Sequence, residues 1–183
     1  MATPRPDRAV IGPVPPGQDP EEYDRLRRRA LWSLPSGLYV VGSRAGGERN
    51  LMTLSWATQV ALEPKLVAIS VERDAMTHRL VAEGGVFSLC TLHREDRAIV
   101  RKLVKPVAEG PEPGALNGFA VRSAVTGAPI LTQAVAWLDC EVRQSLAVGS
   151  HSVFVGEVVD AGFGRPEDAP VLRMEDTRMS YGG

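Results

Sequence analysis

The hydrophobic and polar positions along the chain predict many strands with a few short helices between them. The pattern is most informative from residue 50 to residue 78. It predicts a strand, a turn at Glu63-Pro64-Lys65, a second strand from Leu66 to Val71, and a helix that begins at Asp74. The second strand is almost continuously apolar, so we expect it to be buried. A helix that begins beside a strand presents unpaired N–H groups, which bind anions.

The first of these strands carries small polar side chains where a strand that only covers a core usually carries charges. Alternation predicts two faces, one with Thr53, Ser55, Ala57 and Gln59 and the other with Met52, Leu54, Trp56 and Val60. A face of small hydroxyl and amide groups allows a flat polar ligand to approach the backbone closely. Together with the helix start at Asp74, it predicts a site for a flat ring system with a phosphate tail. Without such a ligand, the same face would be an ordinary solvated sheet surface.

The remaining pattern predicts further strands and two more helices. A helix is expected from Pro20-Glu21 to Leu34, ended by Pro35-Ser36-Gly37, and another from Glu95 to Val104 with Ile99, Val100 and Leu103 inward. Strands are predicted at Leu38–Ser43, Val86–Leu92, Phe119–Ser123, Val135–Val148 and Ser152–Ala161, with a brief helical turn at Pro129-Ile130-Leu131. No regular β-α-β alternation is present. The prediction is therefore a mainly β fold with helices, a barrel rather than a doubly wound sheet.

Two segments lack the pattern of a packed element. Residues 1–20 hold six of the fourteen prolines, so we expect a flexible proline-rich N-terminal arm, or an arm that wraps a partner subunit. Residues 105–118 are rich in proline and glycine and predict an exposed loop, suited to a lid or a partner contact. The folded domain is accordingly expected to span residues 21–183.

Composition narrows the classes of function. The chain has 183 residues and a formal net charge of −1, which gives no support to a nucleic-acid or membrane surface. The arginine cluster at positions 25, 27, 28 and 29 is read as a solvated helix face, with a polyanion site as the alternative. Cys90 and Cys140 lie in apolar runs, which predicts buried reduced thiols and no metal site. With no signal-peptide core or spanning run, a cytoplasmic protein is expected.

Six ordered motifs resemble the flavin reductase-like family with the FMN-binding split barrel. The family patterns F-P-T-G-V-x-V-V-T and G-M-T-V-S-S-F-T-S-V-S-L-D-P-P-L-V are similar to residues 34–41 and 51–67. The patterns R-S-S-x-T-H and G-x-F-x-V-N-x-L are similar to residues 73–78 and 85–92. The patterns G-x-P-x-L-x-x-A-x-A-W-L-x-C-x-V and G-D-H-x-x-F-x-G-x-V are similar to residues 127–142 and 149–158. The resemblance runs from about Leu31 to Ala161.

The resemblance implies a homodimeric split β-barrel that binds FMN or FAD and is reduced by NADH or NADPH. The family includes the reductase components of two-component flavin monooxygenases, so an oxygenase partner that receives reduced flavin is also implied. By position, the implied flavin-binding residues are Thr53, Leu54, Ser55, Trp56, Ala57, Ser70, Arg73, Ala75, Thr77 and His151. Of these, the turn from Arg73 to Thr77 would take the phosphate, and His151 would lie near the nicotinamide. The flavin carries the chemistry, so no catalytic side chain is assigned.

The phosphate turn departs from the family pattern at Asp74 and Ala75, which replace two serines. Ala75 removes a hydroxyl donor, and Asp74 adds a negative charge near the expected phosphate. At about 4 Å and an effective dielectric constant of about 20, two like charges repel by roughly 4 kcal/mol. Asp74 avoids this cost if it turns away as the helix N-cap and accepts a hydrogen bond from Met76 or Thr77 N–H. The other departures are Trp56 for a serine and Cys90 for an asparagine.

Taken singly, several of these residues also have ordinary structural readings. Trp56 and Trp137 could be core or interface residues, His78 a surface helix residue, and His151 a structural or solvated turn residue. The leading prediction is an NAD(P)H-dependent flavin reductase. The alternatives are a non-catalytic module of the same fold that binds flavin, haem or another planar cofactor, and a structural or regulatory protein that has lost the cofactor.

Overall fold

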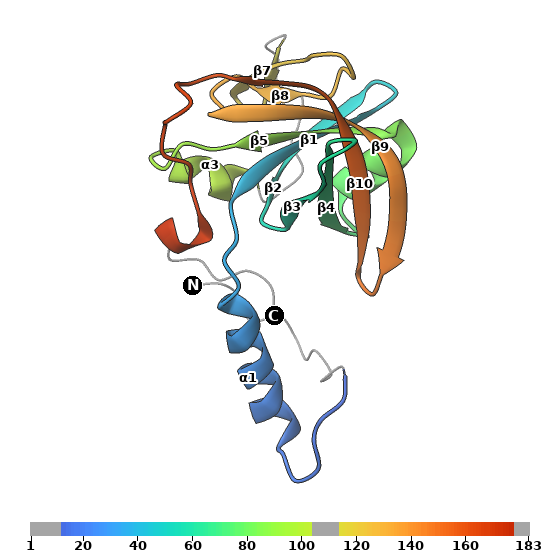
Figure 1. Ribbon diagram of the computed structural model, residues 1–183, viewed down its shortest axis with the longest axis vertical. Coiled ribbons are helices and arrows are strands. Elements are labelled where there is room, and N and C mark those ends of the chain that lie inside the picture. Colours follow the sequence, from blue (N-terminus) through green and yellow to red (C-terminus); the bar gives the residue numbers. More distant parts are fainter. Residues whose placement is uncertain (1–11, 104–113, 178–183) are drawn as a thin grey trace. The chain divides into compact units, whose positions relative to one another are not determined.

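The computed structural model describes residues 12–103 and 114–177, which fall into two compact units divided after Pro35 (Figure 1). The first unit holds helix α1, Pro20–Trp32. Asp19 caps it by accepting a hydrogen bond from Glu22 N at 2.9 Å, and Pro20 stands at the first helical position. The sequence prediction of this helix is confirmed. The expected arm lies largely at residues 1–11, outside the described residues.

The arginine cluster lies on α1 and is largely paired within the helix. Arg27 and Arg28 contact the carboxylate of Asp24 at 2.9 and 3.1 Å, and Arg25 lies 3.8 Å from Glu21. These are i,i+3 and i,i+4 pairs of the kind that stabilise a solvated helix. The pairing supports the solvated helix face over a polyanion site.

The second unit is built on a seven-stranded sheet in the order β2-β1-β5-β9-β10-β4-β3, in which every neighbouring pair is antiparallel. The strands are β1 Tyr39–Ala45, β2 Glu48–Leu54, β3 Ala57–Ala61, β4 Leu66–Glu72, β5 Val86–Thr91, β9 Ala136–Val148 and β10 His151–Phe163. The sheet curls without pairing its two outer strands, β2 and β3 (Figure 1). This confirms the predicted barrel and its split character.

A smaller sheet of three strands lies between residues 115 and 131. Its strands are β6 Ala115–Leu116, β7 Phe119–Arg122 and β8 Ile130–Leu131. The predicted helical turn at Pro129-Ile130-Leu131 is wrong, because Ile130 and Leu131 pair with β7 in register with Arg122 and Val121. The expected loop at 105–118 is likewise wrong at Ala115–Leu116, and its residues 105–113 lie outside the described residues.

The continuous strand predicted from residue 50 is also wrong, because the chain leaves one edge of the sheet and enters the other. β2 pairs with β1 up to Leu54, whereas Ala57 pairs with Ile69 of β4. Ser55 and Trp56 form a two-residue crossing between the outer strands. The single polar face expected from alternation is therefore divided between two strands.

Two helices and a 3₁₀ turn complete the unit: α2 Met76–Gly84, α3 Arg97–Lys102 and η1 Met174–Asp176. α2 ends on Gly85, whose left-handed backbone (φ 66°) allows its N–H to bond Val81 O. Ile99, Val100 and Leu103 are buried as predicted. None of the described helices is long and apolar enough to cross a membrane.

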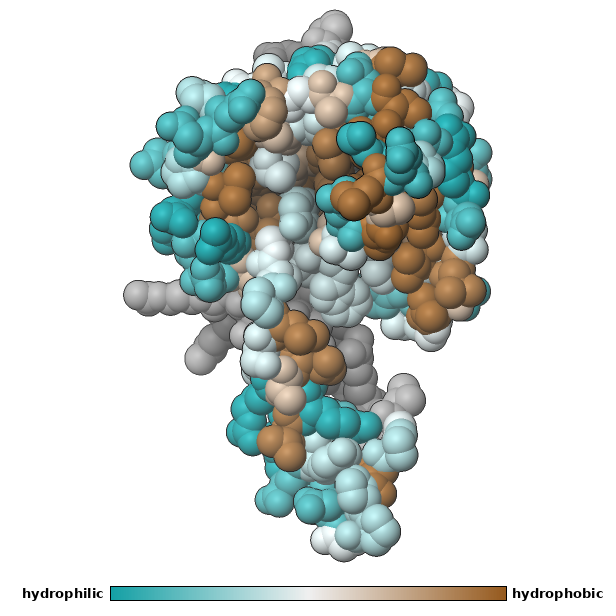
Figure 2. All heavy atoms as spheres, viewed as in Figure 1, coloured by the Kyte–Doolittle hydropathy of each residue, from teal (hydrophilic) through white to brown (hydrophobic). Residues whose placement is uncertain are grey.

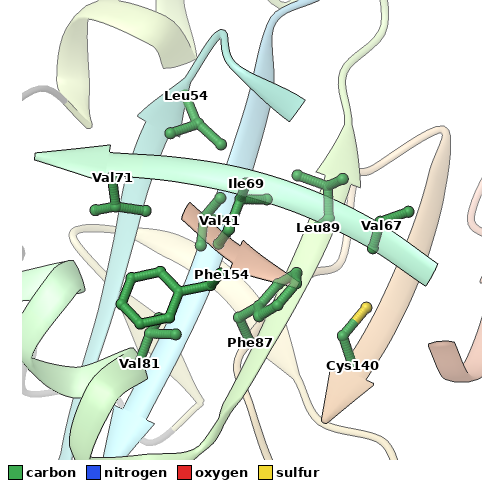
Figure 3. Close-up of a cluster of buried hydrophobic side chains, with 10 residues drawn as sticks. All are labelled: Val41, Leu54, Val67, Ile69, Val71, Val81, Phe87, Leu89, Cys140 and Phe154. Carbon is green, nitrogen blue, oxygen red and sulfur yellow. The ribbon is translucent and has the colours of Figure 1, made fainter. Parts of the chain in front are cut away.

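The core lies inside the curled sheet and is closed by α2 (Figure 3). Phe87 and Phe154 are at most 2% exposed and pack with the aliphatic residues Val41, Leu54, Val67, Ile69, Val71, Val81 and Leu89. On β4 only alternate residues are buried, so the prediction that the whole strand is buried is wrong. Full burial of a side chain of this size stabilises the fold by about 1.5–3 kcal/mol.

Both cysteines are free and buried, as predicted. Burial raises the pKa of the Cys90 thiol to about 11 and that of Cys140 to about 12. Both therefore remain protonated at neutral pH and act as small apolar groups in the core.

Candidate functional site

The crossing segment holds a buried polar atom without a partner. Ser55 is 4% exposed, and its Oγ has no hydrogen-bond partner among the residues described. The segment is held in place by Ser70 N, which donates to Trp56 O at 3.0 Å. A buried hydroxyl that lacks a partner costs about 1–3 kcal/mol. A ligand with a polar edge at this position would remove that cost.

The residues on either side of the crossing are already engaged. Thr53 Oγ1 donates to Val100 O at 3.0 Å, and Thr53 N donates to Leu103 O at 3.2 Å, so this residue is tied to α3 and its C-terminal end. Leu54 belongs to the core, and Ala57 is half-buried at the start of β3. Among the five consecutive residues expected to bind flavin, Ser55 offers a polar atom without a partner in the described residues, and Trp56 is exposed.

The turn after β4 differs from the prediction at Asp74. α2 begins at Met76 and its N-cap is Ala75, with no side-chain capping hydrogen bond. The predicted N-cap role of Asp74 is wrong. Ala75 N donates to Glu72 O at 3.0 Å and closes a tight turn, so the N-cap is Ala75, the residue after Asp74. Asp74 is exposed and leaves the first N–H groups of α2 uncapped.

This turn has the electrostatics of an anion site. The first turn of α2 contains no acidic residue, and the helix N-terminus carries a partial positive charge. Arg73 is exposed, and its guanidinium has no acidic partner within the described ranges. Thr77 instead faces inward, fully buried, and accepts a hydrogen bond from Asn50 Nδ2 at 2.8 Å. Backbone N–H groups and Arg73 are therefore the groups left to hold a phosphate.

The β9–β10 hairpin brings His151 to the same place. Arg73 N donates to Ser150 O at 2.9 Å, and His151 pairs with Glu72, the last residue of β4. The His151 ring lies 4.9 Å from the Trp56 ring, and Ser150 Oγ lies 2.9 Å from its Nδ1. Trp56, Ser70, Arg73 and His151 thus gather at one end of the barrel, although they come from three segments of the sequence.

A second histidine at this end was missed by the sequence analysis. The prediction that His78 is a surface helix residue is wrong, since it is half-buried, with Nε2 2.8 Å from Ser152 Oγ and its ring 5.2 Å from that of Phe154. Burial, and then the charge of Arg73, lower the pKa of His78. The spacing of His78 three positions before the buried Val81 was the available indication that it faces the sheet.

Comparison with known proteins identifies the family to which this fold belongs. The sequence model of the flavin reductase like domain matches residues 31–182, so the chain belongs to the flavin reductase-like family. The resemblance inferred from the six motifs is thereby confirmed. Relatives of the chain include proteins described as reductases.

Two relatives match over most of their own length. The chain is 32% identical to the NADH-dependent FAD reductase of Streptomyces globisporus over 153 residues, 81% of each chain. It is 30% identical to the ferric-chelate reductase (NAD(P)H) of Archaeoglobus fulgidus over 157 residues, 84% of this chain and 90% of that one. It also matches the larger diflavin flavoprotein A 1 of Synechocystis at 28% identity, but spans only 26% of that protein.

Solved structures support the same fold. The NADH:FAD oxidoreductase of Streptomyces globisporus superposes with a TM-score of 0.70 and 29% identity, covering 87% of this chain and 93% of that one. The styrene monooxygenase flavin reductase of Pseudomonas putida superposes with a TM-score of 0.66 and 27% identity, covering 80% and 90%. The predicted split-barrel fold is confirmed.

Proposed function

We propose that this protein is an NAD(P)H-dependent flavin reductase that binds FMN or FAD at the end of the barrel formed by the crossing segment and the α2 turn. When bound there, the flavin supplies the redox chemistry by accepting a hydride from the nicotinamide. The observation that carries the proposal is that the crossing segment, which holds the unpartnered Ser55 Oγ, is bonded through Trp56 O to β4, the strand that leads into the uncapped start of α2. The chain that carries this arrangement belongs to the flavin reductase-like family.

Each residue of the site has a binding or orienting role. The α2 N-terminus and Arg73 hold the phosphate that FMN and FAD share, while Ser55 and the crossing backbone meet the polar edge of the ring. Trp56 and His151 form the wall that faces the nicotinamide. Ser150 and Arg73 fix this wall through their backbone hydrogen bond, so the two substrates meet against a rigid surface.

A titration with three flavins tests the site. Riboflavin lacks the phosphate, so FMN and FAD are expected to bind at least tenfold more tightly, measured by quenching of flavin fluorescence on the apoprotein. Arg73→Met is expected to remove most of that difference and to leave riboflavin affinity unchanged. Arg101→Met, which removes an exposed arginine from α3, is the matched control. Equal affinity for all three flavins in the native protein would rule out the phosphate site.

Steady-state kinetics test the reaction. NADH or NADPH oxidation is expected to depend on added flavin and to saturate with it. The Streptomyces globisporus relative is described as NADH-dependent and as acting on FAD, which supports testing that pair first. A protein that binds flavin but oxidises neither nucleotide would be the non-catalytic module instead.

We further propose that the protein is a homodimer. Beyond Glu141, which pairs with Val86, β9 keeps β10 on one side but has lost β5 on the other. This free edge carries the exposed apolar residues Leu146 and Val148. Figure 2 shows hydrophobic surface over this end of the β9–β10 hairpin. Val148 pairs with His151, so a partner covering this edge would also adjoin the flavin site.

Light scattering during size-exclusion chromatography tests the dimer. The native chain is expected at twice its own mass, and Leu146→Lys with Val148→Lys is expected to shift it to a monomer. Val125→Lys, an exposed apolar residue on the loop before β8, is the control and should leave the mass unchanged. A native monomer at micromolar concentration would exclude this interface.

We also propose that reduced flavin leaves the site for a partner oxygenase, by likeness to the styrene monooxygenase flavin reductase. Release to a partner is favourable only if this protein binds reduced flavin more weakly than the partner does. Anaerobic titration with dithionite-reduced flavin is expected to give a dissociation constant above that of the oxidised form. Tighter binding of the reduced form would mean that electrons leave by another route.

A further inference from the structure

A cavity of about 410 Å³ opens on the barrel and borders the candidate flavin site at Ala57. It lies where β3 and β4 approach their turn, and its walls include Val67, Leu89 and Val158. Figure 3 places Val67 and Leu89 together at one side of the core cluster. Val158 is seven residues from His151 on β10, which is about 23 Å along an extended strand. Only Ala57 is shared with the predicted flavin-binding residues.

The walls of this cavity are apolar and aromatic. Tyr39 and Trp137 line it from β1 and β9. The Trp137 ring is fixed, since the Arg122 guanidinium lies 4.4 Å from its centroid and Gly162 leaves room for its edge, where a Cβ would lie 2.7 Å from Cζ2. The Trp137 ring therefore sets a fixed apolar surface at the cavity, with Tyr39 as the second aromatic residue of its lining.

The polar side chains at the cavity include Thr58, Gln59 and Thr91, but Lys65 is the only charged one among the described residues of its lining. The indole Nε1 of Trp137 is buried without a hydrogen-bond partner in the described part of the chain. Lys65 lines the cavity and is exposed, and its ammonium has no acidic partner among those residues. On β10, Glu157 pairs with Leu66, the residue after Lys65, and its carboxylate is bound by Arg143 at 2.7 Å. The cavity therefore combines an apolar body with an unneutralised positive charge.

We propose that this cavity binds a small aromatic carboxylate of one or two rings, at a site separate from the flavin. The rings would lie against Tyr39 and Trp137, and the carboxylate would meet the Lys65 ammonium. Charge complementarity favours an anion over a neutral arene, and the cavity volume falls in the range of small-molecule sites. Position 65 is a lysine in this chain and a proline in the family pattern, so the positive charge at the cavity is a feature of this chain and not of the pattern.

Calorimetric titration of the flavin-free protein with 2-naphthoate, compared with neutral 2-naphthamide, tests this proposal. We expect naphthoate to bind about fivefold more tightly than the amide, as befits one exposed ion pair. Lys65→Met should abolish that preference, whereas Arg101→Met, which removes a charge from α3, should preserve it. Ala161→Trp, which fills the rim at an exposed position, should abolish binding of both probes.

Flavin titrations on the same variants keep this proposal distinct from the flavin site. We expect Lys65→Met and Ala161→Trp to bind FMN as the native protein does, and naphthoate not to displace FMN. Displacement of FMN, equal affinity for the acid and the amide, or naphthoate binding that survives Ala161→Trp would each overturn the proposal. The proposal would also be overturned if the native protein did not bind naphthoate and Ala161→Trp changed the oligomeric state. That result would assign the cavity to a second copy of the chain.

Discussion

Removing the charge of Asp74 should tighten flavin binding. Asp74 is exposed, caps nothing, and stands next to Ala75 at the uncapped start of α2. For an assumed separation of roughly 7 Å between a phosphate at that helix start and the carboxylate, an effective dielectric constant of about 40–80 gives a repulsion of about 0.6–1.2 kcal/mol per phosphate charge. That energy corresponds to an affinity gain of about three- to eightfold. Asp74→Asn measures the charge alone, and Asp74→Ser adds a hydroxyl donor.

The assay is a fluorescence titration of apoprotein with FMN at two salt concentrations. We expect both variants to bind FMN more tightly than the native protein, with Ser at least equal to Asn, and the gain to shrink at high salt because exposed charges are screened. Riboflavin affinity should not change. Glu167→Gln, an exposed charge on the loop after β10, serves as the control and should leave FMN affinity unchanged. Weaker FMN binding by Asp74→Asn would refute the placement of the phosphate at this turn.

Three further predictions follow from single contacts. Ser55→Ala removes a hydroxyl that lacks a partner, so urea unfolding of the apoprotein should be unchanged or slightly shifted to higher urea, while flavin affinity falls about three- to tenfold. His78 has a lowered pKa in the folded protein, so the unfolded chain binds more protons and the free energy of unfolding should fall as the pH drops below about 6.5. His78→Gln should remove that part of the pH dependence in urea titrations, and an identical profile would contradict it. Gly42→Ala would drive a Cβ into Pro129 O, so we expect a loss of about 1–3 kcal/mol in the free energy of unfolding. Gly47→Ala is the control, because open space surrounds that position, and it should lower the free energy of unfolding by less than about 1 kcal/mol.

Local pattern was enough for most of the strands. β1, β5, β9 and β10 combine apolar runs or alternation with glycine turns, and each was predicted within a few residues. α1 was predicted because its start, with Pro20 followed by two glutamates, and its stop at Pro35 are both encoded locally. The family motifs added the split-barrel topology, which no local pattern specifies.

The failures come from contacts between residues far apart in the sequence. Nothing in the alternation from Met52 to Val60 marks the change of strand at Ser55, because the partners of the two halves, β1 and β4, lie elsewhere in the chain. His78 meets Ser152, which is 74 positions away, and that contact decides its burial. Asp74 had the right residue type for an N-cap, but a backbone hydrogen bond to Glu72 moved the helix start.

The two-residue crossing has a mechanical consequence for the whole barrel. Residues 55 and 56 link strands that lie at opposite margins of one sheet, with five other strands between those margins. A ligand bound at this link restrains both outer strands of the sheet at once. Amide exchange in β2 and β3 should therefore slow together when flavin binds, although the two strands share no backbone hydrogen bond.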